Sequence, residues 1–344
     1  MFTNIYPTGL SRDIIVLLQM WDEPFVEGSK ERWGMNPFNP ANNINNIPGL
    51  PAGDGSAEEE FYDPDNEELM HFQDALIRKL LDETAGAYGN IIYEIGNEIN
   101  MDSRTPKDSA WQKHWIDFFD KYEREHGIEL LLSNDTRREL FDNGAEAFDI
   151  TNHHGFTGFG IRQSKRGNLS GQVYKAVQHD FEKYGKPVVN SRPCSDPDRK
   201  NYPDIVSEDI GRELYWSYFC SGGHIIGFRT TEESWKGGLA AERTIRSVQT
   251  FVKRLSLERF VPHREIADSG LCLADVGREY VIYLPEGGTV SIDLSEVKGD
   301  MITAWYNPRE CRDEKVEEIQ ADGILTFQTP DKNDWVLHLV KKNK

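Results

Sequence analysis

The architecture of this chain follows from one run of ten residues, Ile91-Ile92-Tyr93-Glu94-Ile95-Gly96-Asn97-Glu98-Ile99-Asn100. The first part of the run is mostly apolar, which is typical of a strand buried in a parallel sheet. The last four residues are polar. In a β/α barrel the strand ends point their side chains at the catalytic face, so a carboxylate beside an amide there indicates chemistry. The alternative is a buried strand whose glutamate caps the turn that follows.

Around this run, strands and helices alternate through the first two thirds of the chain, which predicts a parallel sheet wrapped by helices. We expect strands at residues 13–20, 91–97, 128–132, 147–153, 187–191 and 224–228. One helix begins at Pro64-Asp65-Asn66, and the others are expected at 110–125, 171–184, 207–219 and 239–256. If 91–97 is the fourth strand of a barrel, too few residues precede 13–20 for two further units, because one unit needs roughly 30 residues. The prediction is therefore an α/β fold, a TIM (β/α)8-like barrel lacking its first two β/α units.

Beyond Phe260 the spacing of apolar residues changes from the period of a helix to the two-residue period of a strand. Short apolar runs at 280–284, 301–306, 325–328 and 335–340 are separated by turn residues, and 290–294 alternates apolar with polar. This pattern predicts a small antiparallel β-sandwich. We thus expect two domains, a barrel-like domain over 1–260 and the β-sandwich over 261–344.

The Asn97-Glu98 pair at the end of the fourth strand resembles the signature of the retaining (β/α)8 glycoside hydrolase clan of the endoglycanase and mannanase type. The resemblance implies that Glu98 is the catalytic acid/base and that Asn97 binds the sugar 2-hydroxyl. The C-terminal part resembles the collagen-binding type of β-domain that follows the barrel in many bacterial glycoside hydrolases and apiosidase-like proteins. That likeness rests on Tyr280-Val281-Ile282-Tyr283-Leu284-Pro285-Glu286-Gly287-Gly288, Trp305-Tyr306-Asn307-Pro308-Arg309 and Asp334-Trp335-Val336-Leu337-His338-Leu339.

Three further strand ends offer candidate sugar contacts. Trp21 follows the first strand and is expected either to form the floor of a sugar subsite or to pack beneath the following loop. His153 and His154 close another strand; because side chains alternate, only one of them faces the site, and His154 is our candidate. Trp235 follows the last barrel strand, where the resembled family often has a sugar platform, with loop packing as the alternative.

The seventh barrel strand departs from the resembled pattern. The clan places its nucleophile there in sequences such as Lys-Pro-Val-x-x-x-Glu, whereas this chain has Lys186-Pro187-Val188-Val189-Asn190-Ser191-Arg192-Pro193. Arg192 stays protonated and serves neither as nucleophile nor as base. Either another acid supplies the second carboxylate, or Arg192 binds an anionic substrate bidentately, or catalysis is lost and a sugar-binding cleft remains. The candidate acids are Asp22, Asp196, Glu232 and Glu233.

Bulk properties narrow the class of partner. A net charge of −19 argues against nucleic acid or an anionic membrane surface as a partner and says nothing against a neutral glycan. The four cysteines are widely spaced with no CxxC, so no zinc site or disulfide framework is indicated, and we expect neither metal nor organic cofactor. No stretch is long enough to span a membrane, and residues 14–20 are too short an apolar run for a signal peptide.

The sequence thus predicts a glycoside hydrolase that acts on a poly- or oligosaccharide. The rival prediction is a carbohydrate-binding pseudoenzyme or an interaction protein that has lost hydrolysis, and a non-glycosidic barrel enzyme such as a lyase is a third. The long irregular segment at 25–65 is expected to be functional or mobile. A barrel without two of its strands exposes sheet edges. We therefore expect a homodimer across the gap, or the β-sandwich and the 25–65 segment folded into it.

Overall fold

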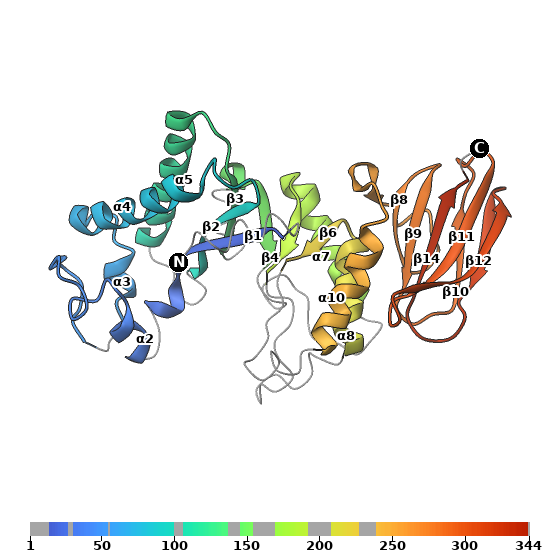
Figure 1. Ribbon diagram of the computed structural model, residues 1–344, viewed down its shortest axis with the longest axis horizontal. Coiled ribbons are helices and arrows are strands. Elements are labelled where there is room, and N and C mark those ends of the chain that lie inside the picture. The colour runs from blue at the N-terminus through green and yellow to red at the C-terminus, as the bar shows by residue number, and fades with distance from the viewer. Residues whose placement is uncertain are drawn as a thin grey trace. The chain divides into compact units, whose positions relative to one another are not determined.

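The computed structural model describes residues 14–26, 30–53, 56–99, 106–136, 145–153, 169–191, 208–226 and 239–342 (Figure 1). The chain forms two compact units, Met1–Asn152 and His153–Lys344. The predicted domain boundary near residue 260 falls within the second unit and stays a prediction. Within the described ranges, no helix has the length and apolar character needed to cross a membrane.

Six strands form the sheet of the α/β part, in the order β1-β2-β3-β4-β5-β6. They are β1 (Val16–Asp22), β2 (Ile91–Ile99), β3 (Leu131–Thr136), β4 (Ile150–His153), β5 (Val188–Asn190) and β6 (Gly223–Ile225). The pairs β1–β2, β2–β3, β3–β4 and β5–β6 are all parallel. The six predicted strands are therefore confirmed, with ends that shift by a few residues. The absence of two further β/α units stays a prediction.

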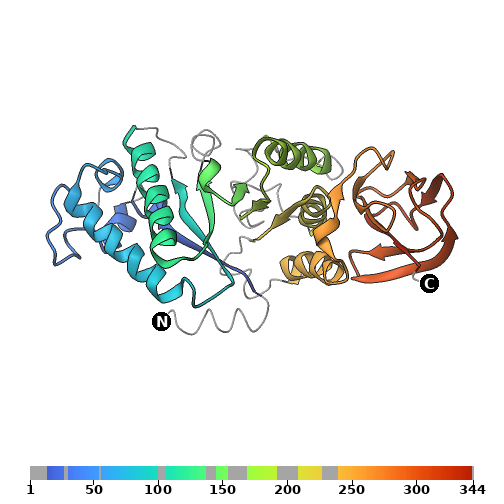
Figure 2. The same ribbon diagram turned by 90° about the horizontal axis from the view of Figure 1, so that it is seen from above.

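The helices of the first unit are α2 (Lys30–Met35), α3 (Glu58–Phe61), α4 (Glu67–Thr84) and α5 (Pro106–His126). The predicted start of α4 is confirmed, because the Asn66 side chain accepts a hydrogen bond from the backbone N–H of Leu69 at 3.1 Å. Polar contacts join α4 to α5 along their length; the indole of Trp111, for example, donates to Gln73 at 2.8 Å. Both views show these helices on one side of the strands of this unit (Figures 1 and 2).

The segment predicted as one irregular stretch at 25–65 contains two short helices and is ordered by asparagine side chains. Asn39 is fully buried; its amide donates to the carbonyls of Trp33 and Gly53 at 3.0 and 2.9 Å, and its oxygen accepts from Ala41 N–H at 2.9 Å. An asparagine that bonds its own backbone neighbours stabilises turns in place of regular secondary structure. The described part of this segment is thus folded by polar side chains.

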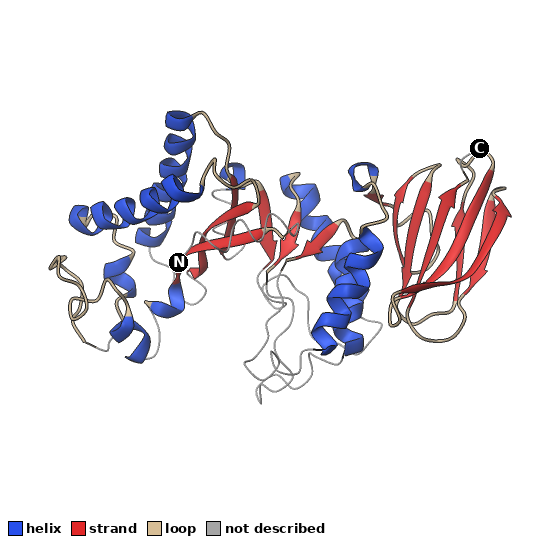
Figure 3. Ribbon diagram, in the orientation of Figure 1, coloured by secondary structure: helices blue, strands red, loops and turns tan. Residues whose placement is uncertain are grey.

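The second unit begins with three helices, α7 (Leu169–Tyr184), α8 (Glu208–Cys220) and α10 (Leu239–Val252), beside β5 and β6. The buried carboxylate of Glu213 on α8 accepts from the backbone N–H groups of Leu169 and Ser170, so α8 caps the N-terminus of α7. These helices match the predicted ones to within a few residues. Figure 3 shows them in blue beside the red strands of the C-terminal part.

The C-terminal part consists of two antiparallel sheets, as predicted. The larger has the order β12-β11-β14-β9-β8-β7 and the smaller the order β10-β13. The strands are β7 (Val261–Pro262), β8 (Leu271–Asp275), β9 (Glu279–Leu284), β10 (Thr289–Asp293), β11 (Asp300–Asn307), β12 (Arg312–Gln320), β13 (Ile324–Gln328) and β14 (Trp335–Lys341). The sequence analysis did not predict β7, β8 or β12. Of these, β12 is mostly exposed and lacks the apolar alternation that marks a half-buried strand.

An aromatic core joins α8 and α10 to the C-terminal sheets. The Trp216 ring of α8 stacks on Tyr283 at 5.9 Å between centroids, and Phe251 of α10 lies 5.0 Å from Tyr306. The backbone carbonyl of Ser247 accepts from the Tyr306 hydroxyl at 2.8 Å. All five residues are buried, so the helices share one hydrophobic core with one face of the larger sheet. The other face of that sheet packs against β10 in a second cluster.

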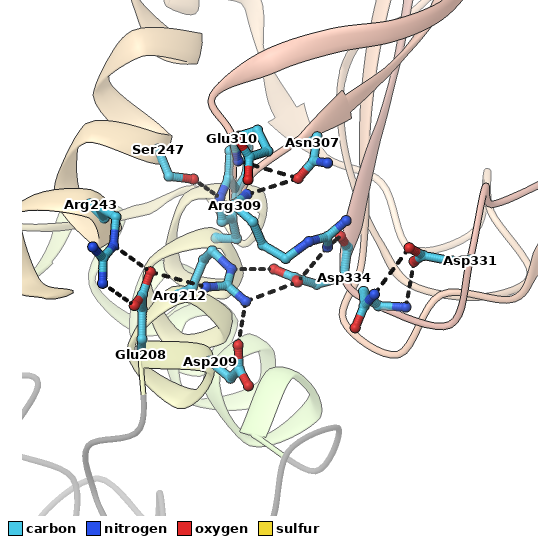
Figure 4. A network of polar contacts seen from close by, with 12 residues as sticks. Glu208, Asp209, Arg212, Arg243, Ser247, Asn307, Arg309, Glu310, Asp331 and Asp334 are labelled. Carbon is cyan, nitrogen blue, oxygen red and sulfur yellow. Dashed lines mark hydrogen bonds and ion pairs between the residues drawn. The ribbon is translucent and has the colours of Figure 1, made fainter.

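A buried ion cluster lies beside this core (Figure 4). Arg212 on α8 is 3% exposed and donates to Asp334 through Nε at 2.7 Å and Nη2 at 3.1 Å. Asp334 also accepts from Arg309 at 2.9 Å, and Arg212 contacts Asp209 at 2.6 Å. Burial opposes the charge of Arg212, but the hydrogen bonds to Asp334 and Asp209 and the negative charge of Asp334 outweigh it and raise the pKa of the guanidinium.

Candidate functional site

The predicted acid and its neighbouring amide both lie in β2. Glu98 occupies the C-terminal end of the strand, where a barrel enzyme carries its catalytic groups, and its side chain is outside the described part of the structure. Asn97 is 1% exposed and is described in full. The geometry of the site is therefore built from Asn97 and the side chains around it.

A group of polar side chains surrounds Asn97 on the face of β1 to β4 that is turned away from α4. The face is assigned by Tyr93, whose hydroxyl donates to Thr84 of α4, so that Glu94 points to the opposite side. We call this group the inner polar cluster; it consists of Gln19, Asp22, Glu94, Asn97, Ser133, Asp135 and Asn152. Four adjacent strands contribute to it.

An irregularity in β2 brings Glu94 and Asn97 to the same face. Simple alternation would put residues three apart on opposite faces. Between Glu94 and Asn97, however, β2 advances three residues while β3 advances two, from Ser133 to Asp135. This extra residue is a β-bulge, which re-aims the side chain that follows it. Gly96 lies within the bulge, where a Cβ would come 2.0 Å from the buried side chain of Ile99, so a larger residue requires that side chain to move.

Glu94 is the centre of the inner polar cluster. It is fully buried and accepts from Gln19 Nε2 at 2.6 Å, Ser133 Oγ at 3.0 Å and Asn152 Nδ2 at 2.6 Å. Burial and, secondarily, the negative charge of Asp135 raise the pKa of Glu94 to about 7, against the opposing effect of the three donors. A carboxyl with such a pKa is half ionised near neutrality, yet it has no path to a substrate because no part of it reaches solvent.

The carboxylate of Asp22 is one of the three acidic groups of this cluster, with Glu94 and Asp135. Asp22 ends β1 in register with Asn97, and Asn97 Nδ2 donates to Asp22 Oδ1 at 2.5 Å. On the other side of the amide, Gln19 Nε2 lies 3.4 Å from Asn97 Oδ1. Asn97 is therefore held by β1 through both of its polar atoms.

The structure places Trp21 in an aromatic cluster. Its ring is 7% exposed and lies 5.5 to 6.0 Å, centroid to centroid, from the rings of Phe38, Phe61, Trp111 and Trp115. Four neighbouring rings and this burial leave no open face on which a sugar can stack. Of the two interpretations offered by the sequence, packing accounts for Trp21, whose ring is part of the aromatic core of this unit.

The remaining candidates lie outside the described residues: His154, Arg192, Asp196, Glu232, Glu233 and Trp235. Their described neighbours are informative. His153 is fully buried, with Nε2 2.8 Å from Asp180 of α7 and Nδ1 3.1 Å from the Tyr218 hydroxyl of α8. It thus has the packing role that was expected for one of the two adjacent histidines.

No group of three or more histidine, cysteine, aspartate or glutamate side chains suited to a metal ion occurs among the residues that the structure describes. The cysteines in this part of the chain, Cys220, Cys272 and Cys311, are free thiols. Burial raises the pKa of Cys220 well above its ordinary value, as expected for a structural thiol.

Sequence reasoning missed Gln19, Glu94 and Asn152 as members of the site. The available signal was Glu94 itself, a charged residue inside the apolar run 91–95. A carboxyl is almost never fully buried unless it is paired or hydrogen-bonded, so it predicts polar partners on the neighbouring strands. Gln19 stands at the matching place in the first strand.

Comparisons with known proteins bear on both parts of the chain. Residues 264–340 match the family model described as "Putative collagen-binding domain of a collagenase". A search of curated protein sequences found no match. Solved structures of similar fold include a glycoside hydrolase with a TM-score of 0.61 and 15% identity, covering 79% of this chain and 69% of that chain. A family 5 glycoside hydrolase from Bacteroides vulgatus has a TM-score of 0.58 and 16% identity, with coverage of 78% and 66%.

A third similar structure is the maltogenic α-amylase AmyB from Thermotoga neapolitana, with a TM-score of 0.53, 10% identity, and coverage of 96% and 79%. The chain thus spans about two thirds of the length of the first two structures. At these identities the likeness shows the fold alone. The chain shares its α/β fold with these solved glycoside hydrolases and has a C-terminal β-domain of the collagen-binding type.

Proposed function

We propose that this protein is a glycoside hydrolase that cleaves an O-glycosyl bond of an oligo- or polysaccharide, with Glu98 as general acid/base. The observation that carries the proposal is the position of Asn97 and Glu98 at the C-terminal end of β2, beside the carboxylate that ends β1. In β/α barrels this end of the sheet carries the catalytic groups. The fold shared with solved glycoside hydrolases supports the same class of reaction.

The other roles in this proposal come from the sequence. Asn97, His154, Arg192 and Trp235 take part in sugar binding, and the second carboxylate comes from Asp196, Glu232 or Glu233. Retention of configuration requires the two carboxyl groups roughly 5–5.5 Å apart, and inversion requires roughly 6.5–9.5 Å with a water between them. Glu94 is not a candidate, because it is fully buried and already accepts three hydrogen bonds.

A second candidate function is carbohydrate binding without hydrolysis. It is favoured by one specific observation, the arginine at position 192, where the resembled clan has its nucleophile. A guanidinium binds a carboxylate or sulfate bidentately and cannot act as a base. On either account, uronides or sulfated sugars are expected to be better ligands than neutral glycosides.

The test is a panel of aryl glycosides that varies both the sugar and the leaving group. It includes glucosides, mannosides, xylosides and glucuronides, each with a 4-nitrophenyl and a 2,4-dinitrophenyl group. Removal of a general acid typically costs about 10²–10⁴ in rate. Glu98→Gln should therefore lower kcat in this range for the poorer leaving group. The loss should be smaller for 2,4-dinitrophenyl, because that group departs with little need for a proton. Glu129→Gln, at an exposed position on the chain before β3, is the matched control.

The outcomes separate the two candidates. Turnover that is lost selectively in Glu98→Gln supports the hydrolase. Saturable binding without turnover, unchanged in Glu98→Gln, supports the binding protein. Turnover that survives the substitution with both leaving groups shows that Glu98 is not the acid.

A further inference from the structure

The end of β1 presents a carboxylate next to the amide of β2. Asp22 and Asn97 are register partners, and Asn97 Nδ2 donates to Asp22 Oδ1 at 2.5 Å. The two side chains differ in exposure, since Asn97 is 1% exposed whereas Asp22 is only partly buried. Asp22 is therefore the member of the pair that solvent, and hence a ligand, can reach.

A chain of hydrogen bonds fixes the direction of the Asn97 amide. Gln19 Nε2 donates to Glu94 Oε1 at 2.6 Å, and the same nitrogen lies 3.4 Å from Asn97 Oδ1. Glu94 is itself anchored from β3 and β4 by Ser133 and Asn152. With its oxygen turned toward Gln19, Asn97 has its NH2 group turned toward Asp22. This series of hydrogen bonds thus holds the NH2 group of Asn97 against Asp22 and orients the Asp22 carboxylate.

This arrangement leaves Asp22 with capacity to accept. An ionised carboxylate has about four lone-pair sites and no proton to donate, and Asn97 uses one of these sites. The donor that a glycan offers to such an acceptor is a hydroxyl, which binds through a charge-assisted hydrogen bond. The negative charge repels a carboxylate or sulfate at the same point.

We propose that Asp22 is a specificity-determining residue that accepts a hydrogen bond from a sugar hydroxyl, and that Asn97 positions it from behind. The inference rests on the proposed function and deepens it. The sugar unit bound at the end of β1 carries a free, unmodified hydroxyl there, and any acidic group of the substrate lies elsewhere. Asp22 thus makes the direct contact with the sugar hydroxyl, and Asn97 contributes by positioning Asp22.

The experiment uses the substitution Asp22→Asn. It keeps the hydrogen bond between residue 22 and Asn97 but removes the charged acceptor that would bind the ligand. An asparagine oxygen at position 22 can still accept from Asn97 Nδ2, and its NH2 group then faces the ligand in place of an acceptor. The probes are the best-bound sugar of the aryl glycoside panel and its 2-deoxy and 3-deoxy analogues. We compare Kd by calorimetry, together with kcat/KM wherever turnover occurs. The matched control is Asp117→Asn, an exposed aspartate paired with Lys113 on α5.

For the wild type, loss of a hydroxyl that bonds an ionised group should weaken binding about 10- to 100-fold for one of the two deoxy analogues. In Asp22→Asn this ratio should fall to about 3-fold or less, with binding of that deoxy analogue unchanged. Asn97→Ala should lower the same ratio, which a general loss of folding would not do. Asp117→Asn should behave as the wild type.

Three results overturn the inference. One is a ratio that Asp22→Asn leaves unchanged. Another is an equal loss of kcat for the parent sugar and its deoxy analogues, which would assign Asp22 to the chemical step. In both of these cases the proposed function stands. No binding of any panel sugar by the wild-type protein would overturn this inference and the proposed function together.

Discussion

Replacing Asp334 by asparagine should destabilise the second unit more than any surface substitution. Asp334 is 2% exposed and accepts from both Arg212 and Arg309. In the variant, one oxygen remains for these donors, and the new NH2 group faces a guanidinium. Arg212 is 3% exposed, so it keeps a buried charge whose remaining carboxylate partners among the described residues are Asp209 at 2.6 Å and Glu208 at 3.8 Å.

The magnitude follows from this burial. Breaking a buried ion pair by removing one partner costs about 3–5 kcal/mol. For a unit of this size, each kcal/mol lowers Tm by about 2–4 °C, so the expected shift is roughly 6–20 °C. The control is Asp313→Asn, which breaks the half-exposed pair of Arg254 and Asp313, 2.8 Å apart. Such a pair contributes at most about 1 kcal/mol.

The assay is differential scanning calorimetry, with urea unfolding followed by tryptophan fluorescence. Because Trp216 lies in the core shared by α8 and the β-sandwich, we expect the helices and the sandwich to unfold in one transition. Equal Tm values for Asp334→Asn and Asp313→Asn would refute the energetic argument. A separate transition for the β-sandwich would refute the shared core.

Two further substitutions test the buried polar groups of the first unit. Because the pKa of Glu94 is raised to about 7 from 4.5, the folded state holds its proton over a range where the unfolded state has lost it. Stability should therefore fall as pH rises from 5 to 8, by about 3 kcal/mol relative to Glu94→Gln, as measured by urea unfolding; parallel pH profiles would contradict this. Asn39→Ala removes the buried amide that donates to the carbonyls of Trp33 and Gly53, at about 0.5–1.5 kcal/mol for each hydrogen bond lost. Hydrogen exchange over residues 36–53 should quicken in this variant and not in Asn45→Ala, and equal rates in the two variants would contradict it.

The fold of this chain is largely readable from its sequence because its regular elements are strongly patterned. The apolar runs of β2 and β9 and the capping asparagine of α4 all fall where the local pattern puts them. The short strands β7 and β8 were not predicted, and two other exceptions have physical causes. β12 is mostly exposed and charged, so it carries no apolar alternation. The order of the segment after β1 comes from asparagine side chains such as Asn39, whose contacts do not follow any period.

The candidate site is less readable, because its decisive contacts run between strands that are distant in sequence. Asn97 and Glu98 are visible as a local motif, but Gln19 and Glu94 are 75 residues apart and their bond depends on register. The bulge at Gly96 adds a difficulty, since strict alternation would have turned Asn97 away from Glu94.

Glu94 breaks the local rule of its own strand, and that conflict is itself evidence about the site. An isoleucine at this position would continue the apolar run and avoid the cost of burying a carboxyl. The chain instead surrounds Glu94 with three donors, and one of them, Gln19, also contacts Asn97. A sequence accepts such a local cost chiefly at functional or strained places. Glu94 fixes Gln19, and Gln19 in turn orients the amide of Asn97. On the proposed function, this amide positions Asp22 at the end of the sheet that carries the proposed acid.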